Sequence, residues 1–187
     1  MPLQKTHNNS KPRVILIIGT PGTGKTTVSK LLSKKLNGIY INSGNIVRNG
    51  YFLGLDIKRN SLIADIDKLQ LFIDNMLLKI RKLTVIDSLL PDIVSLENVL
   101  LVVVLHATTD ELYERLNKKG FEVKKILENI DAELCKICAQ DAIETYGLER
   151  VFEIDTTGSD PKETVALIYE EIRKKLGDNC LKRNFSL

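Results

Sequence analysis

The chain has 187 residues, of which 43% are hydrophobic and 27% charged, a composition typical of one soluble domain and not of a fibre or a disordered chain. Lysine and arginine number 27 against 24 aspartates and glutamates, so the net charge of +3 is far weaker than that of a dedicated nucleic-acid-binding domain. The longest wholly apolar run, residues 99–105, is too short for a membrane span, which needs roughly 20 residues.

Cysteine usage and the N-terminal residues predict a cytoplasmic protein. Residues 1–12 are polar and lack the apolar middle of a secretory signal. Three cysteines, an odd number, argue against a disulfide framework. Cys135 and Cys138 form a lone C-x-x-C inside a helical pattern, for which a metal or redox role is the minor alternative. We expect one domain over residues 1–187, with mobile tails at 1–11 and 178–187.

Short β-branched runs alternate with longer helical stripes, which is typical of βαβ units and a parallel sheet covered by helices. The runs predict strands at residues 13–18, 39–42, 83–87, 99–105 and 151–154. Apolar residues three and four apart predict helices at residues 25–37, 43–48, 66–80, 108–119, 124–144 and 160–176. Residues 49–60 show no clear period.

Three predicted helices carry N-terminal capping signals. Ser43 or Asn45 can cap the short helix at 43–48. Thr108 and Glu111 fit a capping box. Asp160 precedes a proline in the position where the missing N–H costs nothing.

Residues 19–26 (GTPGTGKT) fit the phosphate-loop pattern G-x-x-x-x-G-K-[ST] at every fixed position, between an apolar strand and an amphipathic helix. Such a loop wraps a polyphosphate in backbone N–H groups, and a Cβ at its tightest points would block that approach. The following helix adds its positive dipole end. Lys25 would then reach the β- and γ-phosphates, and the Thr26 hydroxyl would ligate Mg²⁺. The alternative is a glycine-rich turn before a helix.

Asp87 ends the apolar run 83–87, where a Walker-B carboxylate would hold Mg²⁺ directly or through water. The alternative is an aspartate that caps the next turn. We favour the metal role because the phosphate loop needs a carboxylate of this kind.

Two signatures of signalling GTPases are missing. Residues 117–120 (NKKG) do not fit the guanine motif N-K-x-D, and residues 87–90 (DSLL) do not fit D-x-x-G. The length excludes long AAA+ or ABC machines, which leaves compact kinases of nucleotides or small metabolites.

Several further stretches follow in the order typical of one family. They are VILIIGTPGTGKTT (14–27), YIN (40–42), Arg48, VID (85–87), LYERL (112–116), KGF (119–121), KK (124–125) and NI (129–130). With them, the chain resembles the adenylate kinase isoenzyme six family over residues 13–176. That family is atypical, with members in archaea and in eukaryotic nuclei, and the DTT at 155–157 resembles its archaeal members.

The resemblance implies a three-layer α/β/α P-loop NTPase of the NMP-kinase type. Its core, with a five-stranded parallel sheet, would occupy about 13–41, 80–117 and 129–176, its NMP-binding insertion about 42–66 and its LID about 118–128. It implies phosphoryl transfer from ATP to AMP with Mg²⁺, and ATPase activity. It also implies a role in small-ribosomal-subunit maturation, with a small-subunit ribosomal protein or 16S-type rRNA as partner. We expect a monomer without membrane contact.

The resemblance also implies site residues. Those that match the ATP loop are Gly19, Gly22, Thr23, Gly24, Lys25, Thr26 and Thr27. Arg48 matches an arginine of the NMP region, whose guanidinium suits a phosphate; the alternative is a solvated helix-end arginine. Lys119 stands where relatives often have a LID arginine, and keeps the charge without the planar fork. Asp155, Thr156 and Thr157 lie where adenine commonly rests, with a turn-forming role as the alternative.

Further lysines of the predicted LID would add positive potential over the phosphates, with a solvated face as the alternative; they are Lys118, Lys124 and Lys125. Relatives tend to have a histidine at the position of Leu89, implicated in hydrolysis and in ribosomal coupling. His106 is expected to be structural.

We therefore expect an adenylate kinase with ATP and Mg²⁺ as cofactors. Its predicted catalytic residues are Lys25, Asp87, Arg48 and Lys119, and its predicted metal ligands are Thr26 and Asp87. Two alternatives stay open: a nucleotide-switched ribosome assembly factor, and a kinase for another monophosphate such as CMP or dCMP.

Overall fold

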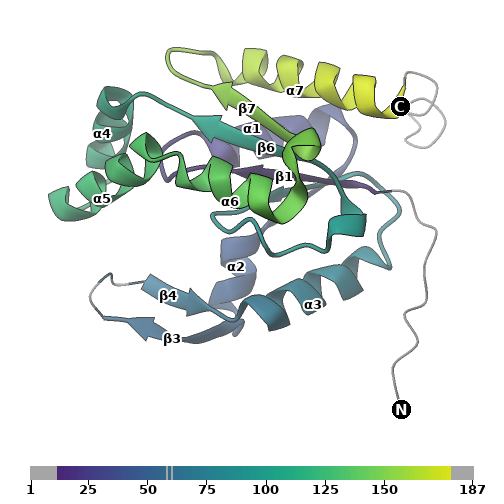
Figure 1. The fold of residues 1–187 in the computed structure, drawn as a ribbon, viewed down its shortest axis with the longest axis horizontal. Helices are drawn as coiled ribbons and strands as arrows, with labels where there is room; N and C mark the ends of the chain where they lie inside the picture. Colours follow the sequence, from purple (N-terminus) through teal and green to yellow (C-terminus); the bar gives the residue numbers. More distant parts are fainter. Residues whose placement is uncertain (1–11, 58, 60, 178–187) are drawn as a thin grey trace.

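The computed structural model describes residues 12–57, 59 and 61–177, and its centre is a parallel five-stranded sheet of order β2-β5-β1-β6-β7 (Figure 1). The strands are β1 (Val14–Ile18), β2 (Ile39–Asn42), β5 (Thr84–Asp87), β6 (Val99–His106) and β7 (Val151–Asp155). All five predicted strands and their parallel pairing are confirmed. The predicted tails at 1–11 and 178–187 lie outside the described residues.

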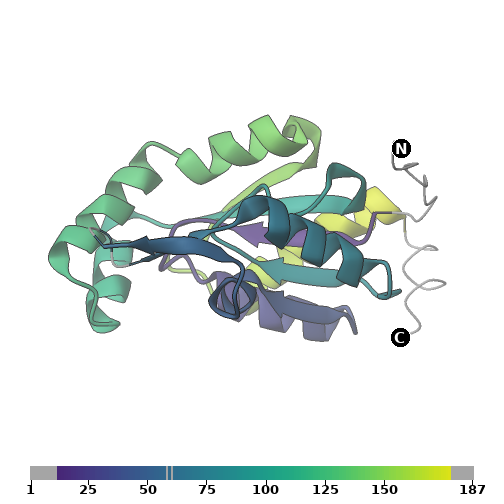
Figure 2. The ribbon, with the colours of Figure 1, turned by 90° about the horizontal axis from the view of Figure 1, so that it is seen from below.

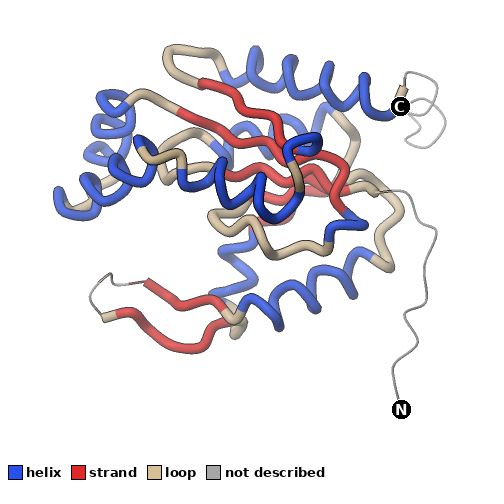
Figure 3. Tube along the Cα trace, viewed as in Figure 1, coloured by secondary structure: helices blue, strands red, loops and turns tan. Residues whose placement is uncertain are grey.

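Helices cover both faces of the sheet, so the predicted three-layer α/β/α architecture is confirmed (Figure 3). The helices are α1 (Lys25–Lys35), α2 (Ser43–Arg48), α3 (Ile66–Leu77), α4 (Thr109–Lys118), α5 (Val123–Leu134), α6 (Ile137–Tyr146) and α7 (Pro161–Leu176). Two short 3₁₀ helices, η1 (Leu96–Asn98) and η2 (Leu148–Arg150), precede β6 and β7.

Alternate residues of β1 build two separate cores. Ile15 and Ile17 face α1 and α7, whereas Leu16 and Ile18 face α2, α3 and α6. All five residues of β1 are fully buried, as are nearly all of β6, and this explains why both strands read as continuous apolar runs. The two cores fix β1, and with it the loop that follows.

An insertion between α2 and β5 contains a hairpin that the sequence analysis does not predict. Antiparallel β3 (Phe52–Asp56) and β4 (Ser61–Ala64) lie within or just after residues 49–60, which show no period. Figure 1 shows this hairpin extending away from the sheet on the same side as α4 and α5. The apolar side chains Leu53, Leu55 and Ile57 are exposed, so the hairpin lacks the one-sided burial that produces a period of two.

The predicted continuous helix at 124–144 is wrong, because the chain breaks between α5 and α6. Lys136 adopts a left-handed conformation with φ 50°, which an α-helix cannot contain. The break gives α5 and α6 separate directions (Figure 2). The residues of the lone C-x-x-C flank it, with Cys135 at the end of α5 and Cys138 in α6.

Two of the three predicted caps differ in the structure. The cap of α2 is Asn42, whose side-chain oxygen accepts a hydrogen bond from the Asn45 N–H, and neither Ser43 nor Asn45 has this role. Thr108 precedes α4 without capping it through its side chain, and Glu111 pairs with Arg115, so the capping box is absent. The cap at Asp160 is confirmed by its hydrogen bond from the Lys162 N–H.

Within the described part of the chain, every helix is too short or too polar to cross a membrane.

Candidate nucleotide site

The carboxyl ends of the central strands bring the phosphate-loop residues together with Asp87. The loop at 19–24 leaves β1 and enters α1, and Asp87 ends the adjacent strand β5. The register pairs Ile17 of β1 and Asn42 of β2 with Asp87. In open parallel sheets, ligands bind at the carboxyl ends of the strands, where these residues lie.

Two glycines give the loop its shape. A Cβ at Gly19 would lie 2.3 Å from the main-chain oxygen of Leu105 in β6, so the loop packs too closely against the sheet for any side chain. Gly24, with φ 92°, precedes the first turn of α1 without a capping side chain, and a Cβ there would meet no atom within 4 Å. No side chain caps the first turn of α1, which leaves its N–H groups available to a phosphate.

We expect Gly19→Ala to destabilise the protein by about 3 kcal/mol or more, because its Cβ would overlap a backbone carbonyl and its φ of 143° is strained for alanine. Thermal unfolding measures this loss. Gly54→Ala is the control, since a Cβ at Gly54 meets no atom within 4 Å. Equal melting temperatures for wild type and Gly19→Ala would contradict the close packing of the loop.

Lys25 lies inside the loop and is almost fully buried. Its Nζ donates hydrogen bonds to the main-chain oxygens of Gly19 at 2.7 Å and Thr20 at 2.9 Å. Burial lowers the pKa of Lys25 to about 8, although the carboxylate of Asp87 opposes this shift. A buried ammonium held only by carbonyl oxygens is well suited to receive an anionic ligand.

Three polar side chains converge on one oxygen of Asp87. Its Oδ2 accepts hydrogen bonds from the Thr26 hydroxyl at 2.6 Å, from Asn42 Nδ2 at 3.0 Å and from the Tyr40 hydroxyl at 3.2 Å. Asp87 is buried, whereas Thr26 is exposed at the start of α1. The predicted pair of Thr26 and Asp87 is thus brought into contact, and Tyr40 and Asn42 join it from β2.

The oxygens of Thr26 and Asp87 are hard donors of the kind that Mg²⁺ prefers. Among the residues described by the structure, no group of three or more His, Cys, Asp and Glu side chains could hold a metal ion. Mg²⁺ usually keeps several waters and shares its ligands with substrate phosphates, so two protein oxygens beside a phosphate loop fit this ion.

The other predicted site cations lie on two separate segments. Arg48, exposed at the end of α2, donates to Asn45 Oδ1 at 2.6 Å. Lys119, exposed after α4, is close enough to Lys25 for its charge to lower the pKa of Lys25. Lys118 instead pairs with Glu114 at 3.5 Å on the surface, an arrangement that fits the alternative of a solvated face.

A cavity of about 360 Å³ lies between the hairpin and the connection from α4 to α5. It is lined by Arg59, Lys119, Gly120, Phe121, Glu122, Lys124, Lys125 and Glu128. Lys125 Nζ donates to the main-chain oxygen of Arg59 at 3.0 Å and joins the two sides. The predicted LID at 118–128 is mostly helical, because only its residues 119–122 lie between α4 and α5.

Residues 155–157 follow β7 and lie beside the phosphate loop. The Thr156 hydroxyl donates to the main-chain oxygens of Thr23 at 3.1 Å and of His106 at 2.8 Å. Asp155 Oδ1 accepts from the Thr157 hydroxyl at 2.6 Å and from its N–H at 2.9 Å. These bonds lower the pKa of Asp155 and place it in a turn, and the predicted contact of residues 155–157 with adenine stays a prediction.

One residue close to the loop is missing from the predicted site. Arg115 Nη1 donates to the main-chain oxygen of Gly22 at 3.0 Å, and its other nitrogen pairs with Glu111 one turn earlier in α4. The motif LYERL contains Arg115, and the i,i+4 spacing from Glu111 predicts this pair. The contact with the loop depends on where α4 packs.

These features define the class of the protein as an α/β protein with the P-loop NTPase fold. A shikimate kinase from Acinetobacter baumannii has a TM-score of 0.62 and 17% identity, with coverage of 87% of this chain and 94% of that one. A deoxyadenosine kinase from M. mycoides has a TM-score of 0.55 and 21% identity, with coverage of 86% and 98%. At such identities the similarity shows the fold alone.

Closer relatives come from archaea. A protein of Methanocaldococcus jannaschii named "Putative adenylate kinase" is 36% identical over 162 residues, 86% of each chain. One of Pyrococcus furiosus with the same name is 34% identical over 169 residues, 88% of each chain. Residues 15–136 match the family described as AAA domain. The chain therefore belongs to the family of these archaeal proteins. It also belongs to the AAA domain family, although at 187 residues it is far shorter than the long AAA+ machines.

Proposed function

We propose that the protein is an Mg²⁺-dependent nucleoside monophosphate kinase that transfers the γ-phosphoryl group of ATP to AMP. The observation that carries this proposal is the contact between Thr26 and Asp87, 2.6 Å apart, beside the buried Lys25. A phosphate loop, a cation and a magnesium-type carboxylate then meet at one strand edge. The names of the archaeal relatives support the same activity.

Each part of the site has a place in this reaction. The backbone N–H groups at the start of α1 would bind the phosphates, and Lys25 would neutralise the charge that develops on the transferred group. Mg²⁺, held by Thr26 and Asp87, would supply further charge neutralisation when bound. Arg48 would bind the AMP phosphate. Since that phosphate is already an anionic nucleophile, the reaction needs no side-chain base, and the protein contributes placement and electrostatics.

We propose the hairpin region, about residues 42–66, as the NMP-binding insertion and residues 118–128 as the LID. Their contact through Lys125 and Arg59, and the basic residues of the cavity between them, support this assignment. Lys119 would add positive charge over the phosphates. A lid that excludes water would direct the phosphoryl group to AMP.

A coupled assay of ATP consumption across AMP, CMP, dCMP, GMP and UMP, with a no-acceptor control, tests the proposal. We expect the highest kcat/KM with AMP and much slower consumption without an acceptor. A higher kcat/KM with CMP or dCMP would favour the alternative kinase. No consumption with any monophosphate would reject the kinase proposal.

ATPase activity and the ribosomal role are separate hypotheses that the resemblance implies. The side chain of Leu89, two residues after Asp87, is exposed and has no group that accepts a proton. We therefore expect the no-acceptor rate to be low. A pull-down with small-subunit ribosomal proteins in ATP and in ADP tests the ribosomal role, and failure to bind in both nucleotides would remove it.

A further inference from the structure

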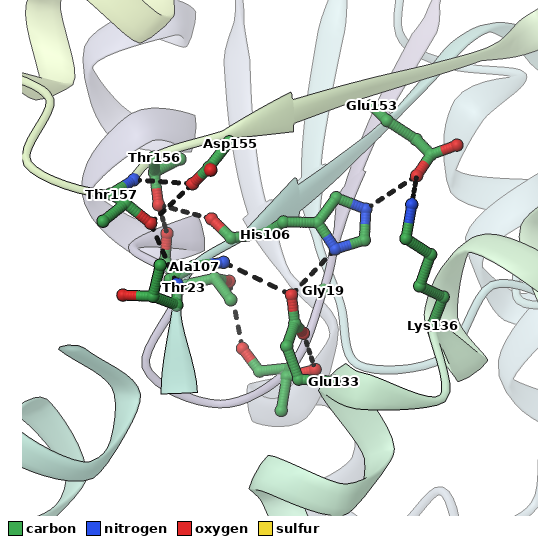
Figure 4. A network of polar contacts seen from close by, with 12 residues as sticks. Gly19, Thr23, His106, Ala107, Glu133, Lys136, Glu153, Asp155, Thr156 and Thr157 are labelled. Atoms are coloured by element: carbon green, nitrogen blue, oxygen red, sulfur yellow. Dashed lines mark hydrogen bonds and ion pairs between the residues drawn. The ribbon is translucent and has the colours of Figure 1, made fainter. Parts of the chain in front are cut away.

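A buried carboxylate that the proposed reaction does not use is bonded directly to the phosphate loop. Glu133, in the last turn of α5, is only 8% exposed, and its Oε2 accepts a hydrogen bond from the Thr20 hydroxyl. Its other oxygen, Oε1, accepts from the Ala107 N–H at 3.3 Å and lies 2.8 Å from His106 Nδ1 (Figure 4). Glutamate is almost never this buried unless it is paired.

His106 satisfies its contacts only when both ring nitrogens carry a proton. Its Nδ1 faces Glu133, and its Nε2 lies 2.9 Å from Glu153 Oε2. An ionised carboxylate only accepts hydrogen bonds, and a neutral imidazole has a single N–H to donate. The charged imidazolium is therefore the form that fits. The hydrogen bond to Glu133 accordingly raises the pKa of His106, although burial opposes this shift. The sequence predicts a structural role for His106, and the structure adds a link from it through Glu133 to the phosphate loop.

The His106–Glu133 pair stabilises the ionised form of Glu133. Burial alone would raise the pKa of Glu133, but the hydrogen bonds from His106 and Thr20 outweigh burial and lower it. The other titratable groups around the pair are Glu153 and Asp155 on β7, Lys136 before α6, Cys138 on α6 and Lys25 on α1.

Thr20 is held from two directions. Its side chain donates to Glu133, whereas its main-chain oxygen accepts from Lys25 Nζ at 2.9 Å and from the Thr23 hydroxyl at 3.0 Å. Thr20 therefore connects α5 to the lysine that would bind the phosphates. Phosphate placement depends on loop geometry at the level of about half an ångström, so such a connection matters for binding.

We propose that Glu133 is a positioning residue of the nucleotide site, which fixes the phosphate loop to α5 through Thr20 and is itself held by the His106 imidazolium. The inference rests on the proposed function, because its effect is on nucleotide binding. α5 begins directly after residues 119–122, so the same helix joins the proposed LID to the loop.

The sign of the pH dependence follows from His106. Below its unfolded pKa of about 6.5, His106 is charged in the folded and unfolded states, and its contribution is fully present. As the pH rises through the raised folded pKa, the imidazole becomes neutral, so Glu133 loses the attraction of a positive charge whichever of the two carboxylates keeps a hydrogen bond. The link from α5 to the loop should therefore weaken above pH about 6.5.

Calorimetric titration of the full chain with Mg-ATP tests this role in a double-mutant cycle of Glu133→Gln and Thr20→Val. Each variant should weaken binding about tenfold, the effect of one charge-assisted hydrogen bond. Glutamine keeps one acceptor oxygen but no charge, so Glu133→Gln weakens the same contact that Thr20→Val removes. The two losses should therefore not add in the double variant. Glu144→Gln, at an exposed site on α6, is the matched control and should bind as wild type does.

His106→Arg provides the pH arm of the experiment, since arginine keeps the charge and several donors at every pH. The variant should retain the affinity of wild type at pH 6.5 and lose less affinity than wild type at higher pH. The pKa of Lys25 is lowered to about 8, so its charge also changes as the pH rises, and the difference between the two proteins at each pH is therefore the measured quantity.

Four results would overturn the positioning role: Glu133→Gln binding within twofold of wild type, Thr20→Val binding within twofold, additive losses in the double variant, or identical pH profiles for wild type and His106→Arg. If Glu133→Gln fails to fold, Thr20→Val, which removes only the partner hydroxyl, decides alone. A wild-type protein that binds no Mg-ATP would reject the proposed function as well, whereas normal wild-type binding with unaffected variants would reject only this inference.

Discussion

Replacing Lys25 by alanine is expected to abolish measurable ADP formation from ATP and AMP, with kcat/KM reduced by about a thousandfold or more. The Nζ of Lys25 donates to two carbonyl oxygens of the phosphate loop, at 2.7 and 2.9 Å. A bound triphosphate would take over this ammonium as its closest buried cation. In a site that excludes water, such a charge contributes far more than on the surface. The coupled assay with ATP and AMP measures the loss.

Two further variants separate a lost charge from a damaged fold. Lys25→Met keeps the aliphatic stem, so it should lose activity like Lys25→Ala while it melts within about 5 °C of wild type. Lys34→Ala removes an exposed lysine from the same helix and should keep full activity. Near-normal turnover of Lys25→Ala would reject the assignment of the site.

The sheet and the phosphate loop could be predicted because each has its own local signal. Residues 14–18 and 99–105 are apolar throughout, since both faces of their strands are covered by helices. The glycines and lysine of residues 19–26 stand at fixed spacings because the backbone must curve around a phosphate. The contact of Thr26 with Asp87, 61 residues later, follows from the chemistry of the magnesium ion that such loops use.

The hairpin and the break before α6 could not be predicted, because their cause is not local. The apolar side chains of β3 and β4 are largely exposed, so no alternation marks the strands. The break at Lys136 involves neither glycine nor proline, and lysine rarely adopts a left-handed conformation. There, the packing of α5 and α6 against different neighbours overrides a helical pattern.

The same distinction applies to the candidate site. Tyr40 and Asn42 reach Asp87 because β2 lies beside β5, and this neighbourhood depends on the strand order. Thr20 and Glu133 are 113 residues apart, and no motif connects them. Periodicity places Glu133 on a helix, but only the orientation of α5 turns its carboxylate to the loop. Motifs therefore find the groups that touch phosphate, whereas groups that support the loop become visible only in the fold.

Asp87→Asn is expected to lower kcat by about a hundredfold or more at ordinary Mg²⁺ concentrations and to raise the Mg²⁺ concentration that gives half-maximal rate. The change removes one negative charge and preserves the shape of the side chain. Asparagine keeps a single acceptor oxygen, which can still receive the hydrogen bonds that Thr26, Tyr40 and Asn42 donate to Oδ2. The loss should therefore reflect the metal and not the fold.

The same variant has a second expected result of opposite sign. Without Mg²⁺, the carboxylate of Asp87 repels a triphosphate beside Lys25, so Asp87→Asn should bind metal-free ATP at least as tightly as wild type does. Calorimetric titrations in EDTA and in Mg²⁺ measure both effects, with Asp92→Asn, an exposed carboxylate in the loop after β5, as control. If Asp87 only capped a turn, Asp87→Asn would instead lower the melting temperature and leave the Mg²⁺ dependence unchanged. That result would remove Asp87 from the metal site.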